Sequence, residues 1–310
     1  DLIQGITLAG VLLDEVALMP ESFVNQATGR CSVLGAKLWF NCNPESPVHY
    51  FYTEWLQKAD EKKLLHIHFR MEDNPSLMPE VIENYKSRYA GVFFQRFILG
   101  LWVMAQGAIY KDSFDDDNLF GDEKIEYINK NMYKMRRYIW IDYGTINPMV
   151  YLDVYDDGRI LYVVNEYYYD SKKTGREKTD TEYGEDLIKF IGTKSIKPMY
   201  IVIDPSAASF KAQLRSKGFR GKAAEDTINA DNKVLDGIRH VSVLLKKKML
   251  LFHKENCTHT INELKSYVWD DKALQNQAKE KPLKIADHGP DAVRYGCYTL
   301  INSRRYNNAS

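Results

Sequence analysis

Two stretches of the sequence are apolar runs that end in an aspartate. Residues 138–142 read YIWID and residues 200–204 read YIVID, so Asp142 and Asp204 each stand where an apolar run stops. Neither run alternates apolar and polar residues, which is typical of central strands covered on both faces. If the two strands are parallel neighbours, they lie about 4.8 Å apart. Two carboxylates then meet at one edge of a sheet, where their repulsion raises one pKa and favours a divalent cation.

Residues 285–295, which read IADHGPDAVRY, offer a third carboxylate. Pro290 suits the first position of a helix, which predicts that Gly289 is the cap and that Asp291 lies in the first turn. The helix dipole favours an ionised carboxylate at that place. Asp287 then lies outside the helix and is the weaker ligand candidate.

Three carboxylates from two strand ends and one helix start suit a metal-dependent hydrolase. They could hold two metal ions about 3.5–4 Å apart, a geometry that supports in-line attack of water on a phosphodiester. Hard oxygen ligands of this kind suit Mg²⁺ or Mn²⁺. The alternative is that these acids are ordinary turn residues and helix caps, and the pattern alone leaves both interpretations open.

A further pair of acids, Asp14 and Glu15, ends the run VLLDE at residues 11–15. An apolar strand that ends in two acids is typical of the motif that binds magnesium and water in P-loop ATPases. Such a site also needs a phosphate loop, and the pattern G-x-x-x-x-G-K-[ST] occurs nowhere in the chain. We therefore expect a nucleotide site that is incomplete, and no ATP hydrolysis by this chain alone.

The elements that must position these residues follow from hydrophobic periodicity and turn signals. Residues 138–142, 149–155 and 160–169 predict a meander of three strands, with Asp157-Gly158 in a turn. Helices and strands then alternate, which predicts a mixed sheet flanked by helices. The expected elements are helix 181–191 with its cap at Thr179 or Asp180, strand 200–204, helices 210–217 and 234–248, strand 250–253, and helices 258–269 and 290–301.

The first part of the chain predicts a separate α/β segment. Its expected elements are strands at 8–13, 36–41 and 64–69 and one helix at 79–99. The acidic, irregular run at residues 112–122 indicates a boundary. We therefore expect one domain at 1–108, a linker at 109–136 and a second domain at 137–310.

Composition narrows the possible partners. The 310 residues are 45% hydrophobic and 27% charged, as in a soluble globular protein, and no apolar run approaches the roughly 20 residues of a membrane helix. The four cysteines are scattered, which favours reduced thiols. Because the formal net charge is zero, nucleic-acid binding must come from local patches, for which Lys172–Lys178 is the best candidate. The chain has no initiator Met, and we expect it to be a trimmed fragment.

The chain resembles the large terminase subunit of tailed bacteriophages, the motor that packages DNA into capsids. The resemblance covers nearly the whole sequence and depends on the order and spacing of short motifs, since no single one decides. They are VLLDE at 11–15, NCNP at 41–44, DNPSL at 73–77, RFILGLW at 96–102, GAIY at 107–110, IDYG at 141–144, IDPS at 203–206 and DHGPDAVRY at 287–295.

This resemblance implies an α/β fold with an RNase H-like mixed sheet flanked by helices, preceded by an incomplete P-loop-type α/β ATPase segment. In the family the RNase H-like domain is a nuclease that cuts concatemeric DNA, and its three carboxylates map onto Asp142, Asp204 and Asp291. His288 matches a histidine often found beside the third acid, where it could orient water or a ligand, or simply pack and cap the helix. The strands that carry the first two acids are parallel neighbours in that fold.

For the ATPase part, the resemblance implies that Asp14 holds the Mg²⁺ of ATP through water and that Glu15 activates the attacking water. Asn43 matches the sensor of the γ-phosphate. ATP is then a cofactor of the full-length motor only, whereas the nuclease uses Mg²⁺ or Mn²⁺.

The expected partners are double-stranded DNA, the portal protein and the small terminase subunit, with a homo-oligomer for the full-length motor and no membrane. The expected location is the host bacterial cytoplasm, with transient docking on the procapsid portal. Two alternatives stay open: another RNase H-like nuclease of the resolvase or transposase type, against which residues 73–110 argue, and a non-catalytic module that grips DNA or docks on the portal.

Overall fold

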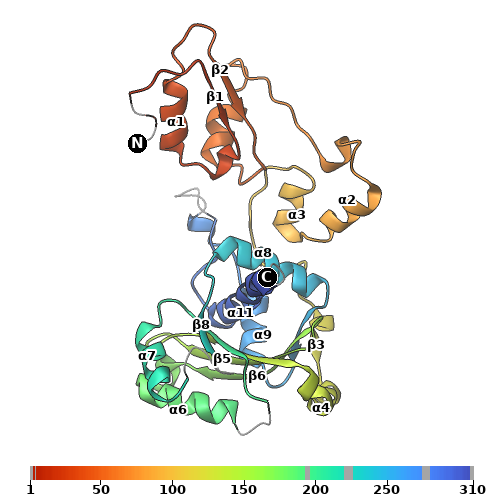
Figure 1. The fold of residues 1–310 in the computed structure, drawn as a ribbon, viewed down its shortest axis with the longest axis vertical. Coiled ribbons are helices and arrows are strands. Elements are labelled where there is room, and N and C mark those ends of the chain that lie inside the picture. Colours follow the sequence, from red (N-terminus) through yellow and green to blue (C-terminus); the bar gives the residue numbers. More distant parts are fainter. Residues whose placement is uncertain (1–2, 4, 193–195, 220–225, 274–279, 308–310) are drawn as a thin grey trace. The chain divides into compact units, whose positions relative to one another are not determined.

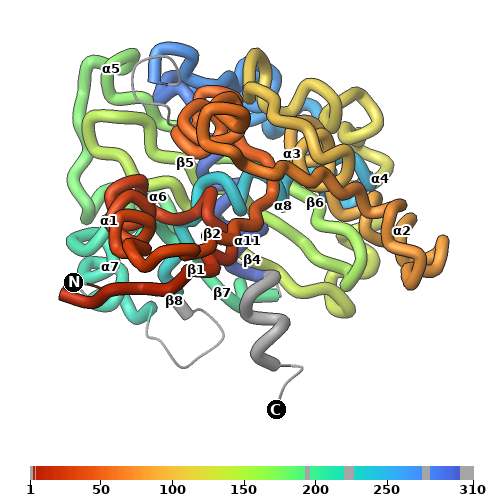
Figure 2. Tube along the Cα trace, turned by 90° about the horizontal axis from the view of Figure 1, so that it is seen from above, coloured from red at the N-terminus to blue at the C-terminus, as the bar shows by residue number. Residues whose placement is uncertain are grey.

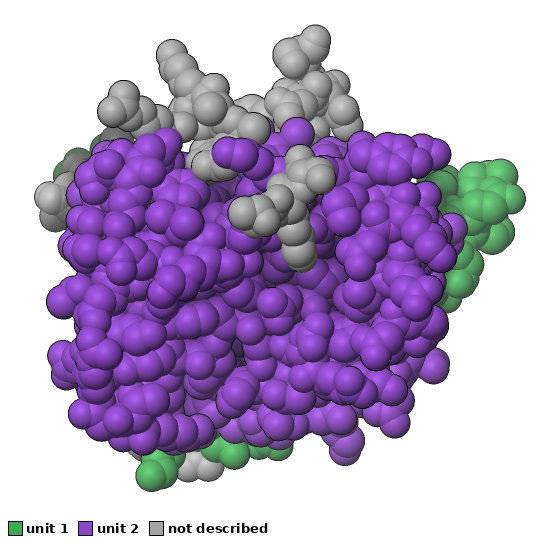
Figure 3. Space-filling model, turned by 90° about the horizontal axis from the view of Figure 1, so that it is seen from below, with its two compact units in different colours: residues 1–106, 270–281 green, residues 107–269, 282–310 purple. Residues whose placement is uncertain are grey.

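The structure is a computed structural model that describes the chain except residues 1–2, 4, 193–195, 220–225, 274–279 and 308–310. The chain forms two compact units, coloured separately in Figure 3. The first unit comprises residues 1–106 and 270–281, and the second comprises residues 107–269 and 282–310.

The second unit is built on a seven-stranded mixed sheet of order β3-β9-β6-β5-β4-β7-β8. Strands β4 (Arg136–Asp142), β5 (Met149–Asp156) and β6 (Leu161–Tyr169) form the expected antiparallel meander. On one side of it β7 (Tyr200–Ile203) runs parallel to β4, and β8 (Asp226–Asn229) runs parallel to β7. On the other side β9 (Leu250–His253) runs parallel to β6, and β3 (Leu119–Phe120) runs parallel to β9.

Helices cover both faces of this sheet (Figure 1). One face packs against α6 (Asp180–Ile191) and α7 (Ala208–Ser216), with Ile139, Ile141 and Tyr151 of the sheet in the shared core. The other face carries α8 (Val234–Lys246), α9 (Thr258–Ser266) and α11 (His288–Asn307). The sequence lacks alternation along β4 because both faces of the strand are buried.

Helix α11 crosses β4 at very short range. A methyl group placed on Gly296 would come within 1.9 Å of the Trp140 ring, so this crossing requires a glycine. Figure 2 shows α11 beside α8, and a methyl group on Gly237 of α8 would come within 2.5 Å of the Arg294 side chain. Close packing on two sides therefore fixes the position of α11 relative to the strand that ends in Asp142.

A buried ion pair lies on the opposite face of β4. Arg137 Nε and Nη2 donate to the two carboxylate oxygens of Asp153 on β5, at 2.7 and 3.0 Å. The guanidinium also donates to the carbonyls of Ile191 and Ile196. Both side chains are almost wholly buried, so the pair is completed by hydrogen bonds to protein groups.

The first unit contains a two-stranded parallel sheet of β1 (Gly10–Leu13) and β2 (Lys37–Phe40). Its helices are α1 (Glu21–Gly29), α2 (Pro79–Lys86) and α3 (Gly91–Phe97). The buried guanidinium of Arg96 on α3 binds the carboxylates of Glu45 and Glu280. Glu280 belongs to the 270–281 segment, which this bond ties into the first unit.

Several sequence expectations hold. The strand at 250–253 and the helix that begins after Thr179 are confirmed, and Thr179 and Glu182 form a capping box. The three-strand meander and the two strands 8–13 and 36–41 are also present, with ends shifted by at most two residues. None of the helices in the part of the chain that the structure describes is long and apolar enough to span a bilayer.

Other expectations need correction. Residues 109–136 lie in the second unit rather than in a linker, because they supply β3 to the sheet and α4 (Asp122–Asn131) to its core. The strand expected at 64–69 is absent, and residues 64–70 are irregular with Leu65, Ile67 and Phe69 exposed. The helix expected at 79–99 is two helices, since Ala90 is extended and Gly91 has φ 54°. Helix α11 begins at His288, so Gly289 is not its cap.

The remaining short elements lie mostly between the main ones. They are α5 (Ser171–Thr174) and the short helical turns Val16–Leu18, Tyr52–Leu56, Met71–Asp73, Asp116–Asn118 and Met132–Lys134.

Candidate metal centre

Strands β4 and β7 bring two of the candidate acids together. The two strands pair in parallel with Ile141 opposite Ile203. The next residues, Asp142 and Asp204, therefore lie side by side at the carboxyl ends of neighbouring strands. This confirms the strand pairing on which the sequence argument depended. Asp204 accepts a hydrogen bond from the Ser206 amide at 2.8 Å, which turns the chain away from the strand.

The start of α11 brings two more candidates to the same edge. His288 Nδ1 lies 2.9 Å from Asp142 Oδ2. Three residues further on, Asp291 is buried in the first turn, and its amide donates to the Asp287 carbonyl at 2.8 Å. Asp287 is therefore outside the helix, as expected. Ala286 has φ 50°, an unusual backbone conformation for a residue with a side chain, where the chain turns into α11.

Burial and like charge act together on Asp142. Desolvation raises the pKa of Asp142 to about 7, and the charges of Asp291 and Asp204 add to the rise, against the hydrogen bond from His288. Burial lowers the pKa of His288, but its hydrogen bond to Asp142 and the charge of that carboxylate raise it, and the net shift is upward. The hydrogen bond between the two groups thus lowers the pKa of Asp142 and raises that of His288.

Cations and phenols hold the other two acids. Lys284 Nζ lies 2.7 Å from Asp291 Oδ2 and 2.8 Å from Asp287 Oδ2. Arg294 Nη2 donates to Asp291 Oδ1 at 2.9 Å. Tyr295, one helical turn after Asp291, donates from its hydroxyl to Asp204 Oδ2 at 3.1 Å. These contacts offset part of the negative charge and orient the carboxylates.

The donor set suits a hard divalent cation by its chemistry. Asp291 and Asp204 lie near enough to Asp142 for their charges to raise its pKa, and a cation would relieve this repulsion. Among the described residues, no three His, Cys, Asp or Glu side chains are grouped as metal ligands. Lys284 and Arg294 occupy the oxygens of Asp291, so a cation that used Asp291 would have to displace Lys284 from it.

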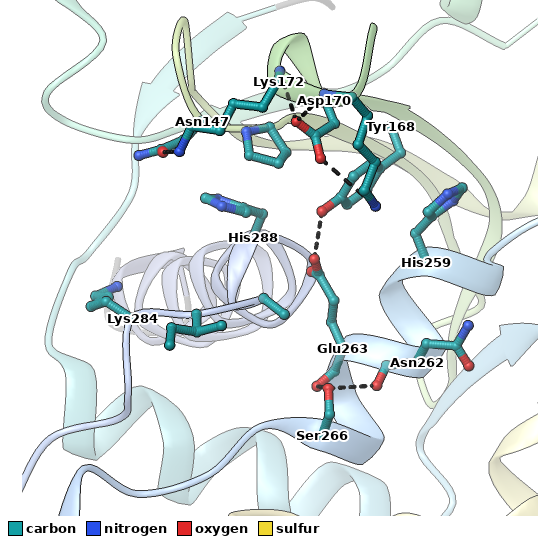
Figure 4. A pocket seen from close by; sticks show the side chains of 14 residues that line it. Asn147, Tyr168, Asp170, Lys172, His259, Asn262, Glu263, Ser266, Lys284 and His288 are labelled. Atoms are coloured by element: carbon teal, nitrogen blue, oxygen red, sulfur yellow. Dashed lines mark hydrogen bonds and ion pairs between the residues drawn. The ribbon is translucent and has the colours of Figure 1, made fainter.

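A pocket of about 520 Å³ opens beside this edge. His288 lines it from the start of α11, together with Tyr168 of β6 and Glu263 of α9 (Figure 4). Its basic residues are Lys172, Lys173, His259, Lys284 and His288. The Lys172–Lys178 segment that the sequence favoured for DNA contact thus supplies two lysines to the wall of the pocket.

The first-unit candidates also share a sheet edge. Asp14 and Glu15 follow β1, Asn43 follows β2, and all three are exposed. The Glu15 amide donates to Asn41 Oδ1 at 2.7 Å, and Glu15 has φ 54°. Parallel pairing of β1 and β2 therefore places these polar residues at the same end of the two strands.

Comparisons with known proteins agree with this architecture. A family model described as "Terminase large subunit, T4likevirus-type, N-terminal" matches residues 1–113. A solved structure of the large terminase from a thermophilic bacteriophage is 50% identical, with a TM-score of 0.85, over 97% of this chain and 70% of that chain. The chain belongs to the large terminase family. The same phage terminase in complex with ADP aligns with a TM-score of 0.83 and 50% identity, over 97% of this chain and 71% of that one. Its complex with ATP-gamma-S aligns with a TM-score of 0.83 and 50% identity, over 96% of this chain and 72% of that one.

A search of curated proteins gave no match. The fold expected from the sequence is confirmed for this terminase chain: an RNase H-like mixed sheet flanked by helices lies in the second unit, and an α/β segment of the ATPase type lies in the first. The family match also supports a role in the packaging motor.

Several residues of the site were not predicted from the sequence. Arg294 and Tyr295 stand three and four residues after Asp291, so helical spacing alone could have placed them beside it. Glu263 and Tyr168 contact the site from elements far away in the sequence. No local pattern marks these two residues.

Proposed function

We propose that the second unit of this terminase is a metal-dependent DNA endonuclease that cuts concatemeric viral double-stranded DNA during genome packaging. The observation that carries the proposal is the parallel pairing of β4 with β7, which sets Asp142 beside Asp204. Asp291 adds a third carboxylate, since its charge acts on Asp142. The reaction class is hydrolysis of a phosphodiester.

Each residue has a proposed role. Asp142, Asp204 and Asp291 would hold two Mg²⁺ or Mn²⁺ ions, which when bound supply positive charge for the phosphate and lower the pKa of water. His288 holds Asp142 through Nδ1 and orients it. Tyr295 fixes Asp204, and Arg294 fixes Asp291.

The direct test is nicking of supercoiled plasmid. We expect the wild type to nick plasmid in Mn²⁺ or Mg²⁺, and chelation by EDTA to stop the reaction. A wild type that leaves plasmid intact under all metal conditions would favour the rival function, a non-catalytic module that grips DNA or docks on the portal.

We propose that the pocket lysines bind DNA phosphates, because packaging must accept every sequence. Lys173 is largely exposed beside the pocket. We expect the double variant Lys172→Ala, Lys173→Ala to weaken binding to duplexes of any sequence and to reduce the salt dependence of log Kd by up to about 2.

Lys130 on α4 offers a matched control for this prediction, since it is exposed and lies outside the pocket. Binding titrations across salt concentrations measure both slopes. An equal loss for Lys130→Ala, or no loss for the double variant, would rule out a specific role of the pocket.

We propose that Asp14, Glu15 and Asn43 belong to the ATP site of the motor, and that this chain alone does not hydrolyse ATP because its sequence has no phosphate loop. We expect ATP with Mg²⁺ to leave its Tm unchanged, since binding to the folded state alone would raise it. A nucleotide-dependent rise of Tm in a thermal melt would contradict this.

We further propose double-stranded DNA, the portal protein and the small terminase subunit as partners, and a homo-oligomer for the full-length motor. The corresponding location is the host bacterial cytoplasm, with transient docking on the procapsid portal. Pull-down of the chain with purified portal tests the docking, and no retention at low salt would count against it.

A further inference from the structure

The first turn of α11, which bears His288, is tied to the rest of the unit by one buried carboxylate. Glu263 of α9 is only 6% exposed. Its Oε2 accepts a hydrogen bond from the Gly289 amide at 2.6 Å, directly after His288. Its Oε1 accepts a hydrogen bond from the Tyr168 hydroxyl at 2.5 Å. Both oxygens are therefore engaged, one by the helix that carries the candidate site and one by the sheet.

The contacts that join α9 to the start of α11 are close. Figure 4 shows the Glu263 side chain extending from α9 toward Tyr168, with His288 at the start of the neighbouring helix. A methyl group on Gly289 would come within 2.8 Å of the Thr260 backbone, so α11 begins in direct contact with α9. A charged hydrogen-bond acceptor makes a stronger bond to an amide than a neutral one does. The amide of Gly289 is thereby held in one place relative to β6.

The anchor on the sheet is itself rigid. The Tyr168 ring stacks on His259, with centroids 4.5 Å apart and planes at 12°. Glu166, two residues earlier on β6, accepts the amides of His259 and Thr260 at the start of α9, at 2.7 and 2.9 Å. Strand β6 therefore fixes α9 at its first turn, and α9 in turn fixes α11 through Glu263.

We infer that Glu263 is a positioning residue of the proposed nuclease site, which holds the first turn of α11 so that His288 faces Asp142 and Asp291 faces the same edge. The inference rests on the proposed function of that site. Glu263 acts through Gly289, because it accepts a hydrogen bond from the amide of that residue. It does not act as a ligand of the cation. Loss of the tie lets the turn shift, and small displacements of reacting groups reduce rates strongly.

The test compares two tyrosine–carboxylate bonds on adjacent residues of β6. Tyr168 bonds Glu263 on the site face, whereas Tyr167 bonds Asp186 of α6 on the other face, at 2.8 Å. We expect Glu263→Ala to lower the kcat of plasmid nicking by about 10- to 100-fold, as for residues that support metal ligands, with little change in the KM for DNA. Tyr168→Phe should lower kcat several-fold, and Tyr167→Phe should leave it unchanged.

Glu263→Gln separates positioning from folding, because the amide oxygen of glutamine can still accept the Gly289 hydrogen bond. We expect this variant to recover most of the wild-type kcat. Equal kcat for Glu263→Ala and the wild type, or equal losses for Tyr167→Phe and Tyr168→Phe, would overturn the inference alone. A wild type that does not nick plasmid would overturn the proposed function, and this inference with it. Thermal melts of all variants identify any that fail to fold.

Discussion

Replacing Asp204 by alanine is expected to lower plasmid nicking in Mn²⁺ by at least about 10²-fold, the usual cost of removing one electrostatic element from a transition state. Asp204 follows β7 beside the end of β4, and the Tyr295 hydroxyl holds it from α11. The fold should survive, because Asp204 lies at a strand end and is only half-buried.

The control for this prediction is Asp112→Ala. Asp112 is an exposed acid of the same unit, and the comparison removes a carboxylate of equal charge outside the cluster. We expect it to nick at the wild-type rate. Equal nicking by Asp204→Ala and the wild type would mean that the cluster is structural, and the nuclease assignment would fail.

The second large effect is on stability. Asp153→Ala leaves the Arg137 guanidinium buried without its carboxylate, which typically costs about 3–5 kcal/mol. Two carbonyls remain as hydrogen-bond acceptors, at Ile191 and Ile196, but they carry no charge. We expect a large fall in the urea concentration at the midpoint of unfolding, measured by circular dichroism.

A partly exposed ion pair of the same unit provides the comparison. Asp236 pairs with Arg239 on α8 at 2.8 Å, and both side chains are about one third exposed or more. Because solvent screens such pairs, Asp236→Ala should shift the unfolding midpoint far less. Similar shifts for the two variants would show that the Arg137–Asp153 pair contributes nothing special to the fold.

The sequence could predict the second unit well because its strands are unusually apolar. Residues 138–142 and 200–204 lie in the middle of the sheet, where burial on both faces removes every polar residue until the acid at the end. The same reasoning failed for β3 and β8. The two residues of β3 are too few for any periodicity, and β8 reads DTIN, with a single large apolar residue. Both lie at the edges of the sheet. Hydrogen bonding to a neighbouring strand defines them, not a hydrophobic pattern in the sequence.

The first unit was harder to predict for a different reason. Leu65, Ile67 and Phe69 alternate as a strand should, yet they are exposed and residues 64–70 are irregular. Alternation predicts a strand only where a partner strand and a core exist, and the described part of this unit has a sheet of β1 and β2 alone. The prediction of one helix at 79–99 was wrong for a local reason. The apolar periodicity continues across Gly91, but the helical backbone is interrupted there.

The candidate site shows the same division. Strand ends and a helix start placed Asp142, Asp204 and Asp291 on elements that the structure brings near one another, and the family resemblance added His288. It could not find Glu263, because the contact with Gly289 joins α9 to α11 across 26 residues and depends on how the two helices pack. Residues of the proposed metal centre stand at the ends of helices and strands, which local sequence reveals. Residues that support them depend on tertiary contacts.

The most direct test of the metal centre is a crystal of this chain soaked in Mn²⁺ and measured for anomalous scattering. We expect anomalous density between Asp142, Asp204 and Asp291, with Lys284 moved away from Asp291, and no such density in Asp204→Ala crystals treated alike. Anomalous density only elsewhere in the chain, or three acids that keep their contacts with Lys284 and Arg294 at saturating Mn²⁺, would contradict the proposed metal centre.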